Sequence, residues 1–519
     1  MKTALHAPHA RPAGGGALAL AGLVLVVLLF GASTALLDWD VAAIAMTALV
    51  PALLMFWDYR VGLALLIFIL PFDNAQFLPK LGPLSALNVL ILGVTLAFLL
   101  QAGVRRFTAR PLAVLVPPTL FWFYVVPLAV AVVVGSLHFS EMSAAYLVKT
   151  HPEGYKLSTY WVSDWFKHLL LVAAACVLGS AVYAARSGRR WMAMFALAAL
   201  AFVLAQFVLT AVTGVSLEAL QNARAFFIYL GRQNNEAGVM LVTAFGPLLF
   251  MRAMVKSRGL RLALALLALA IVVAVLLTGS RGAFVATGVV VLMYLLHFRR
   301  LRTAFAIGTL VVIGVAVAPD AIQERLLSGL HGKQGIENIA SRGDKLSAGR
   351  IYIWESLAPE IARSPIYGRG LMSTQWSRYV RSGAFDANHP HNLYLEILMD
   401  GGIYGAICMF VFYRWVWRSF RRLGRDERLD PGVRGFFLGA SAGFIGMLTY
   451  GLTNSHWYPA PEQVFFWLAI GMAIGYSRIA QELPELAVLK PLRGGSRSRP
   501  TFGRRVRPAW PRALPQSVR

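Results

Sequence analysis

The sequence has little charge and almost no cysteine. Only 14% of its 519 residues are charged, 58% are hydrophobic, and the mean hydropathy is +0.62. Soluble domains carry about 25% charged and about 45 to 50% apolar residues, so this composition excludes a soluble domain and a disordered chain. The two cysteines, Cys176 and Cys408, lie inside apolar runs, which argues against a disulfide framework or a thiolate metal site. The chain is expected in a membrane.

Acidic residues are scarce as well. Asp and Glu number 24 against 49 Lys and Arg, which gives a formal net charge of +25. In a soluble protein this excess would favour a polyanionic partner. In an inner-membrane protein the concentration of Lys and Arg in cytoplasmic loops explains it without one. No nucleic-acid partner is therefore expected.

Long apolar runs dominate the chain, and a spanning helix needs about 20 mostly apolar residues. Candidate runs lie near residues 16–37, 41–57, 60–72, 84–103, 111–135, 164–185, 190–213, 235–254, 260–278, 281–297, 301–318, 393–416, 434–453 and 461–478. The second and third are short and separated only at the segment Trp57-Asp58-Tyr59-Arg60, so the total is 12 to 14. The first has no small-residue cleavage site after it and is expected to stay as a signal-anchor helix. The sequence predicts an all-α, polytopic inner-membrane helical bundle.

Loop charge gives the orientation. With the N-terminus in the cytoplasm, the arginine-rich loops near 105–110, 186–190, 252–261 and 414–434 all fall inside, and the outside loops carry far fewer Lys and Arg. The C-terminus is then also cytoplasmic. The expected location is the bacterial inner membrane, with multiple passes and the lipid bilayer as a partner.

Four regions follow from this threading. Residues 1–318 hold about 11 spanning helices, 319–392 form one large periplasmic loop, 393–478 hold about three more helices, and 479–519 form a disordered, basic cytoplasmic tail. Ile351, Trp354, Leu357, Ile361 and Tyr367 have spacings typical of short amphipathic helices, so the loop is expected to be partly helical.

Arg281 is the first candidate site residue. It lies in Thr278-Gly279-Ser280-Arg281-Gly282-Ala283, which joins two apolar runs with almost no loop. A cation near bilayer depth is costly, and an anion in a cavity would offset the cost. The alternative is an arginine that snorkels to the interface.

Arg232 begins a second polar cluster, Arg232-Gln233-Asn234-Asn235-Glu236, at the outside end of the next span. A guanidinium with amide side chains suits phosphate or sugar hydroxyls, because it combines paired donors with neutral donors and acceptors. Helix capping by Asn234 or Asn235 is the alternative.

His389-Pro390-His391-Asn392 ends the long outside loop. A histidine takes up a proton near neutral pH and can activate a hydroxyl for attack, although a structural or surface histidine is the alternative. Two histidines raise metal binding, but no third ligand follows at a suitable spacing. Earlier in the loop, Arg350 and Arg369 are candidates for further anion contacts.

One rival metal signal is Asp38-Trp39-Asp40 in the first outside loop. The Asp-x-Asp form holds divalent ions in many sugar-transferring enzymes. Solvated turn residues are the alternative reading. No metal and no cofactor are expected.

These segments, taken in order, resemble the O-antigen ligase and O-antigen polymerase superfamily. The resemblance rests on Arg232 to Ala237, Thr278 to Ala283, Arg350 with Trp354 and then Ser364-Pro365 to Gly370, and His391-Asn392-Leu393-Tyr394-Leu395 with Gly402 to Gly405. It covers residues 190–416 in detail. Where the family commonly has Asn-Pro-Asn after the first arginine, this chain has Gln233-Asn234-Asn235, so which amide matters stays open.

The resemblance implies a metal-independent, inverting glycosyltransferase. Its donor would be a glycan linked to undecaprenyl pyrophosphate, and its acceptor a hydroxyl of a glycan or of the lipid A core at the periplasmic face. Arg232 and Arg281 would hold the pyrophosphate, and His391 would assist the acceptor hydroxyl, with His389 able to share or take that role. The other expected substrate contacts are Asn234, Asn235, Ser280, Arg350, Asn392 and His389.

Two alternatives remain. A repeat-unit polymerase for O-antigen or exopolysaccharide would use the same site with another acceptor. A transporter for an anionic solute would use Arg232 and Arg281 as its binding pair, but the sequence has no inverted repeat.

Overall fold

The computed structural model describes residues 54–73, 75–76, 78, 80–81, 84–105, 112–142, 155–212, 227, 229–299, 350–382 and 389–483. The chain divides into two units, Met1–Glu482 and Leu483–Arg519, and the described residues up to 482 belong to the first. Helices make up most of this part. The exception is a short antiparallel ladder between β1 (Lys80–Leu81) and β2 (Leu84–Ser85). The predicted all-α class is confirmed.

Nine helices in the described part are long and apolar enough to cross a membrane. Four are α-helices without a π-helical turn: α4 (Ala86–Arg105), α10 (Arg189–Val212), α12 (Asn234–Met254) and α13 (Arg258–Thr278). Two contain π-helical turns. The first consists of α5 (Pro118–Leu120), η2 (Phe121–Val125), α6 (Val126–His138) and η3 (Phe139–Glu141). The second consists of α8 (Leu157–Thr159), η4 (Tyr160–Phe166) and α9 (Lys167–Ala185). The last three are α20 (Leu393–Arg425), α21 (Pro431–Tyr450), and η7 (Pro461–Gln463) continued by α22 (Val464–Glu482).

Two shorter apolar helices accompany them. These are α3 (Tyr59–Ile69), which runs into η1 (Leu70–Phe72), and α14 (Arg281–His297). The predicted apolar runs therefore coincide with helices wherever the structure describes them. The runs at 16–37 and 301–318, and most of 41–57, lie outside the described residues, so the total of 12 to 14 spans stays a prediction.

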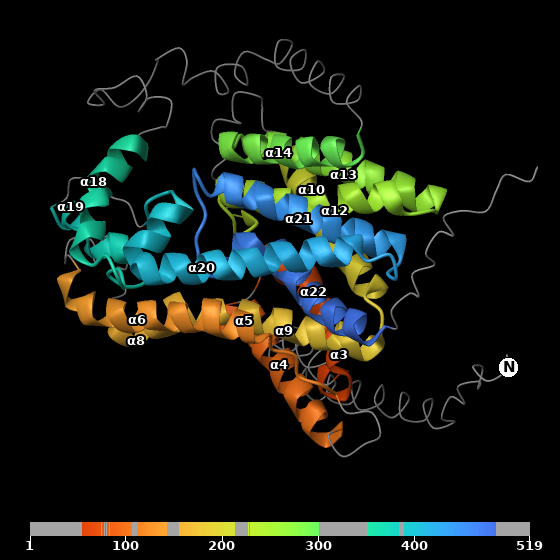
Figure 1. Ribbon diagram of the computed structural model, residues 1–519, viewed down its shortest axis with the longest axis horizontal. Helices are drawn as coiled ribbons and strands as arrows, with labels where there is room; N and C mark the ends of the chain where they lie inside the picture. Colours follow the sequence, from red (N-terminus) through yellow and green to blue (C-terminus); the bar gives the residue numbers. More distant parts are fainter. Residues whose placement is uncertain are drawn as a thin grey trace, which may run out of the picture. The chain divides into compact units, whose positions relative to one another are not determined.

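Helices α12 and α21 pack closely (Figure 1). A Cβ built on Gly439 would lie 2.1 Å from the carbonyl oxygen of Gly246, and one on Gly246 would lie 2.4 Å from that of Gly439. Only hydrogen fits between the two backbones, which is typical of small-residue contacts between membrane helices. This contact fixes the end of α21 beside the start of α12.

The helix α20 is broken near its start. Gly402 has φ 59° and ψ −157°, a conformation that interrupts the helix. The N–H groups of Ile403 and Tyr404 donate instead to the carbonyl oxygens of Pro365 and Ile366, at 2.8 and 3.0 Å. Carbonyl groups of the loop segment before α20 thus take the place of the acceptors that one turn of the helix would supply.

The carbonyl groups freed by the break are satisfied by the same segment. The N–H groups of Arg369 and Gly370 donate to the carbonyl oxygens of Met399 and Asp400, at 2.8 and 3.0 Å. These four backbone groups at the break therefore have partners, as buried backbone requires. The segment 365–370 is docked into α20.

The helix α18 (Arg350–Arg363), the turn η6 (Ser373–Trp376) and the helix α19 (Arg378–Arg381) make up the described part of the predicted large loop. Helices α18 and α19 lie beside the start of α20 in Figure 1. The expected helix over Ile351 to Ile361 is confirmed, and Leu357 is its fully buried residue. The domain boundaries at 318, 392 and 478 stay predictions.

Candidate functional site

Three arginines without a carboxylate partner form the cationic part of the site. Arg232 comes directly before α12 and is only 2% exposed. Its guanidinium donates weakly to the carbonyl oxygens of Leu70 and Gly231, at 3.4 and 3.3 Å, and its buried Nε has no hydrogen-bond partner. Within the described residues no carboxylate oxygen lies within 4.0 Å of it. Arg232 interacts electrostatically with the buried carboxyl group of Glu462, so its charge is partly compensated, while its weakly bonded N–H groups are left for an anionic ligand.

Arg281 and Arg350 are the other two. Arg281 is the first residue of α14 and Arg350 is the first residue of α18. In the part of the chain that the structure describes, neither side chain makes a hydrogen bond or an ion pair with another residue. Burial lowers the pKa of Arg350, and the nearby positive charge of Arg281 lowers it further. The two guanidinium groups are thus close enough to repel each other, which an anion between them would relieve.

Tyr450, at the end of α21, connects the starts of α12 and α14. Its hydroxyl donates to the carbonyl oxygen of Asn235 at 2.8 Å. On the other side, a Cβ on Gly282 would lie 2.4 Å from Oγ1 of Thr453 and 3.2 Å from the ring of Tyr450. The segments that carry Arg232 and Arg281 therefore meet at the same end of α21.

His391 approaches this end from the loop before α20. The N–H of Leu393 donates to the carbonyl oxygen of Gly451 at 2.8 Å, and the indole N–H of Trp354 donates to that of Pro390 at 3.0 Å. Both bonds fix the segment that carries His391. The Nδ1 atom of His391 lies 3.1 Å from Oδ1 of Asn454.

The backbone of His391 is strained, and its charge state is set by its surroundings. Its φ of 51° lies in the left-handed region, which a non-glycine residue adopts only when its surroundings require it. Burial lowers the pKa of His391, the hydrogen bond to Asn454 opposes this, and the charge of Arg350 lowers the pKa further. The ring is therefore neutral at pH 7 and able to accept a proton.

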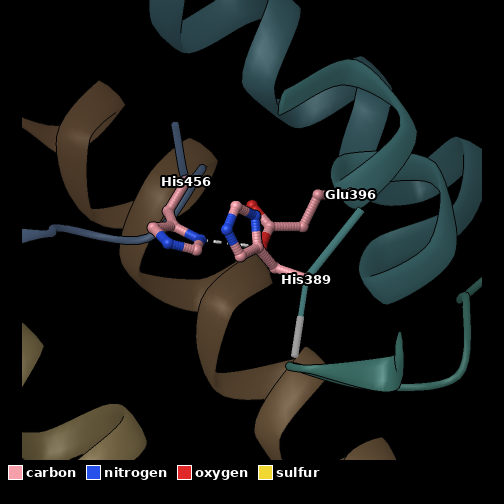
Figure 2. A group of neighbouring side chains, drawn as sticks. All are labelled: His389, Glu396 and His456. Atoms are coloured by element: carbon pink, nitrogen blue, oxygen red, sulfur yellow. Dashed lines mark hydrogen bonds and ion pairs between the residues drawn. The ribbon is translucent and has the colours of Figure 1, made fainter. Parts of the chain in front are cut away.

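His389, Glu396 and His456 form a cluster (Figure 2), and the ring centroid of His389 lies 4.0 Å from that of His391. Glu396 comes from the first turn of α20 and His456 from the loop between α21 and α22. The Nδ1 atom of His456 donates to Glu396 Oε1 at 2.9 Å, and the N–H of Trp457 donates to Oε2 at 3.2 Å. Although burial disfavours its charged form, the carboxylate of Glu396 raises the pKa of His456 to about 9. The pair is an ion pair at neutral pH.

These three residues are also the group in the described structure that could hold a metal ion, with ligand atoms all within 4.8 Å of one another. Their hydrogen bonds point to another state. The imidazolium of His456 has no lone pair on Nδ1, the nitrogen that donates to Glu396. Nδ1 of His389 accepts the N–H of His391 at 3.2 Å. An ion bound to Nδ1 of either histidine would displace these bonds, whereas Nε2 of a neutral His456 could bind one while Nδ1 still donates to Glu396. The expectation that the site holds no metal stays a prediction, and Asp38 and Asp40 lie outside the described residues.

The residues expected to contact the substrate differ in their local environments. Asn392 caps α20, because its Oδ1 accepts the N–H groups of Tyr394 and Leu395 at 2.9 and 3.1 Å. Asn234 and Asn235 are the first two residues of α12 and do not cap it, because Gln233 precedes them as the cap residue. Ser280 is buried directly before α14.

Arg369 was a candidate for a further anion contact, and its charge is already neutralised. It is 7% exposed and pairs with Glu360 at 2.6 Å and with Glu141 at 2.7 Å. These bonds hold the loop region against the helix that ends at Glu141. Of the two arginines proposed from this loop, Arg350 alone lacks such a pair within the described residues.

The sequence reasoning missed the residues contributed by the last two helices. Tyr450, Asn454 and His456 lie at the end of α21 and in the loop after it, and Glu396 lies one turn into an apolar helix. Two signals were available. The run Asn454-Ser455-His456-Trp457-Tyr458 is polar and aromatic between two apolar runs, and Glu396 is an ionisable residue inside a spanning segment.

Fold and site define a polytopic, all-α membrane protein with a cationic, histidine-containing site at one end of its helices. Residues 265–410 match the family model described as O-Antigen ligase. This stretch contains Arg281, Arg350 and His391 but not Arg232, Asn454 or His456. The resemblance seen in the sequence is thereby confirmed over these residues.

Two curated proteins are similar to part of the chain. A protein of Rickettsia conorii named "Putative polysaccharide ligase" is 28% identical over 120 residues, which cover 21% of this chain and 28% of that protein. One of Rickettsia felis with the same description is 25% identical over 120 residues, which cover 21% of this chain and 29% of that protein. The chain therefore matches less than a third of the length of these relatives.

Proposed function

We propose that the protein is a membrane-embedded glycosyltransferase of the O-antigen ligase type, which moves a glycan from undecaprenyl pyrophosphate to a hydroxyl acceptor. The single observation that carries this is that Arg281, Arg350 and the buried, neutral His391 lie close together, and neither arginine has a carboxylate partner within the described residues. The family match over residues 265–410 supports the reaction class. The site faces the periplasm and the protein lies in the bacterial inner membrane.

Arg232, Arg281 and Arg350 bind the pyrophosphate of the donor. The bond between the anomeric carbon and the pyrophosphate oxygen breaks, and its electron pair leaves with the pyrophosphate. Negative charge therefore grows beside the arginines as the reaction proceeds. Fixed cations in a site poor in water stabilise that charge, and removing one such donor typically lowers the rate by about 10² to 10³.

His391 acts on the acceptor. As the hydroxyl oxygen attacks the anomeric carbon, its proton passes to the free ring nitrogen of His391, and a single displacement inverts the anomeric configuration. A neutral imidazole suits this role at pH 7. The arginines supply the charge stabilisation, so the reaction requires no metal. Asn234, Asn235, Ser280 and His389 line the sugar-binding region.

A transfer assay tests the proposal. Purified protein in liposomes is given undecaprenyl-pyrophosphate glycan and an acceptor, and Arg281→Ala and His391→Ala are each expected to lower turnover at least about 100-fold. The matched control is Arg258→Ala, which removes an exposed arginine from the start of α13. Full turnover in the two site variants would end the assignment, and transport of a free anionic solute in place of transfer would favour the transporter.

The acceptor decides between a ligase and a polymerase. A deletion strain is expected to accumulate finished glycan on its lipid carrier and to lack it on the lipid A core. If the strain instead carries single repeat units on the core, the protein is a polymerase that uses the same site.

A further inference from the structure

Three hydrogen bonds connect His391 to the start of α12. His391 Nδ1 lies 3.1 Å from Oδ1 of Asn454, and Nδ2 of Asn454 donates to the hydroxyl of Tyr450 at 3.0 Å. The Tyr450 hydroxyl donates in turn to the carbonyl oxygen of Asn235 at 2.8 Å. The three bonds join residues from three separate parts of the chain.

The direction of each bond in this series is determined by its last member. A backbone carbonyl only accepts, so the single hydrogen of the Tyr450 hydroxyl is used on Asn235. The hydroxyl oxygen can then only accept from Asn454, which must turn its NH₂ group toward it. The amide oxygen of Asn454 is thereby left facing His391.

An amide oxygen also only accepts, so Nδ1 of His391 must carry the ring hydrogen. A neutral imidazole has one ring hydrogen, and its other nitrogen, Nε2, therefore keeps its lone pair. The hydrogen bonds thus select one of the two tautomers without adding a charge.

We propose that Asn454, oriented by Tyr450, is a positioning residue that fixes the tautomer of His391 so that Nε2 is the base. This rests on the proposed role of His391 in transfer. It assigns a function to the end of α21, which lies beyond the stretch matched by the family model.

Helix termination does not account for the Asn454 side chain. The backbone N–H of Asn454 already donates to the carbonyl oxygen of Tyr450 at 3.1 Å, so the helix end is closed without the amide. A carboxylate at this position would also accept from His391, but it would add a negative charge near Arg350 and favour the protonated ring, against the burial and the positive charge of Arg350 that keep it neutral. A neutral amide orients the ring and leaves the cationic pocket for the donor.

Two substitutions of Asn454 test the proposal. Asn454→Leu keeps the size of the side chain and removes both bonds, and it is expected to lower kcat about 100-fold with the donor KM changed less than about 2-fold. Asn454→Asp keeps the acceptor for His391, so its kcat is expected to be at least about 10-fold higher than that of Asn454→Leu.

The pH profile separates positioning from a merely structural role. The titratable groups near His391 are His389, Arg350, His456 and Glu396. The carboxylate of Asn454→Asp adds a negative charge that favours the imidazolium, so the acidic limb of kcat is expected to move to higher pH. Tyr450→Phe frees the amide to turn and is expected to lower kcat about 10-fold. Thr449→Val, whose hydroxyl bonds only within α21, is the control and should keep wild-type kcat.

An unchanged kcat in Asn454→Leu, or an Asn454→Asp variant as slow as Asn454→Leu with an unmoved acidic limb, would overturn the positioning role. If Asn454→Leu does not fold, the kcat of Tyr450→Phe and the acidic limb of kcat in Asn454→Asp test the positioning role instead. His391→Ala separates the two proposals. Undiminished turnover in His391→Ala ends the role of His391 itself, whereas an inactive His391→Ala beside a fully active Asn454→Leu ends only the role of Asn454.

Discussion

At the scale of single residues, the site is defined by which charges have partners. Arg369 is paired with two carboxylates, whereas the described structure gives Arg232, Arg281 and Arg350 none. The presence of an arginine therefore does not by itself identify an anion site, because a guanidinium paired with carboxylates is already neutralised. The same holds for histidines, since His456 is held charged by Glu396 and His391 is held neutral by burial and nearby cations.

The charge of Arg350 sets the protonation of its neighbour. In Arg350→Ala the loss of a positive charge favours the protonated imidazole, so the pKa of His391 is expected to rise. Activity requires the neutral ring, and the acidic limb of kcat at saturating donor should move to higher pH by the same amount. A pH series on Arg350→Ala, with Arg258→Ala as control, measures this. An acidic limb that stays in place would contradict the predicted coupling.

At the scale of elements, the break in α20 depends on one glycine. A Cβ on Gly402 would lie 2.5 Å from the backbone of Gly368 and of Ile366, and its φ of 59° disfavours any other residue. The break in α20 lets the segment 365–370 form backbone hydrogen bonds with this helix. The sequence showed Gly402 and Gly405 as a pair, and the structure separates their roles.

Gly402→Ala and Gly405→Ala form a matched test. Gly402→Ala forces backbone apart and is expected to destabilise the protein by about 2 to 4 kcal/mol. A Cβ on Gly405 meets nothing closer than the carbonyl oxygen of Ile397 at 3.6 Å, so Gly405→Ala should keep the wild-type Tm. Thermal unfolding in detergent measures both. Equal Tm values for the two variants would show that the docked segment does not require Gly402.

The ion pair between Glu396 and His456 fastens the loop after α21 to the first turn of α20. The folded pKa of His456, about 9, lies above its ordinary value of 6.5, so the pair contributes its full stability below about pH 6.5 and loses it as pH rises through 9. The Tm of the wild type is expected to fall between pH 6.5 and 10 by more than that of Glu396→Gln. The contribution is on the order of 1 to 3 kcal/mol. Parallel Tm curves for the two proteins would disprove it.

At the scale of the whole molecule, membrane topology decides whether the site meets its substrates. Arg232 at the start of α12, Arg281 at the start of α14 and His391 before α20 share one end of the helices through the end of α21. Alternating helix direction brings them together there. Loop charge predicts that this end faces the periplasm.

Cysteine labelling tests the orientation. In a chain with Cys176 and Cys408 replaced by serine, Tyr367→Cys should react with a membrane-impermeant maleimide added to cells with a permeabilised outer membrane. Tyr367 is 54% exposed and lies in the segment docked beside the site. Lys256→Cys, between α12 and α13, should react only after lysis. The opposite pattern would reverse the proposed orientation.

The helices that the structure describes, and the site candidates at their ends, could be predicted from the amino-acid sequence. Apolar runs predict spanning helices because unpaired backbone groups are costly in lipid, which is a local constraint on length and composition. Arg232, Arg281 and His391 were recognisable because each begins or precedes an apolar run. Which charges are neutralised, as in Arg369, followed only from the packing of the helices, and the same packing brings Tyr450, Asn454 and His456 to His391. Such contacts join residues up to hundreds of positions apart, and they arise from the packing of helices, which no local pattern of residues records.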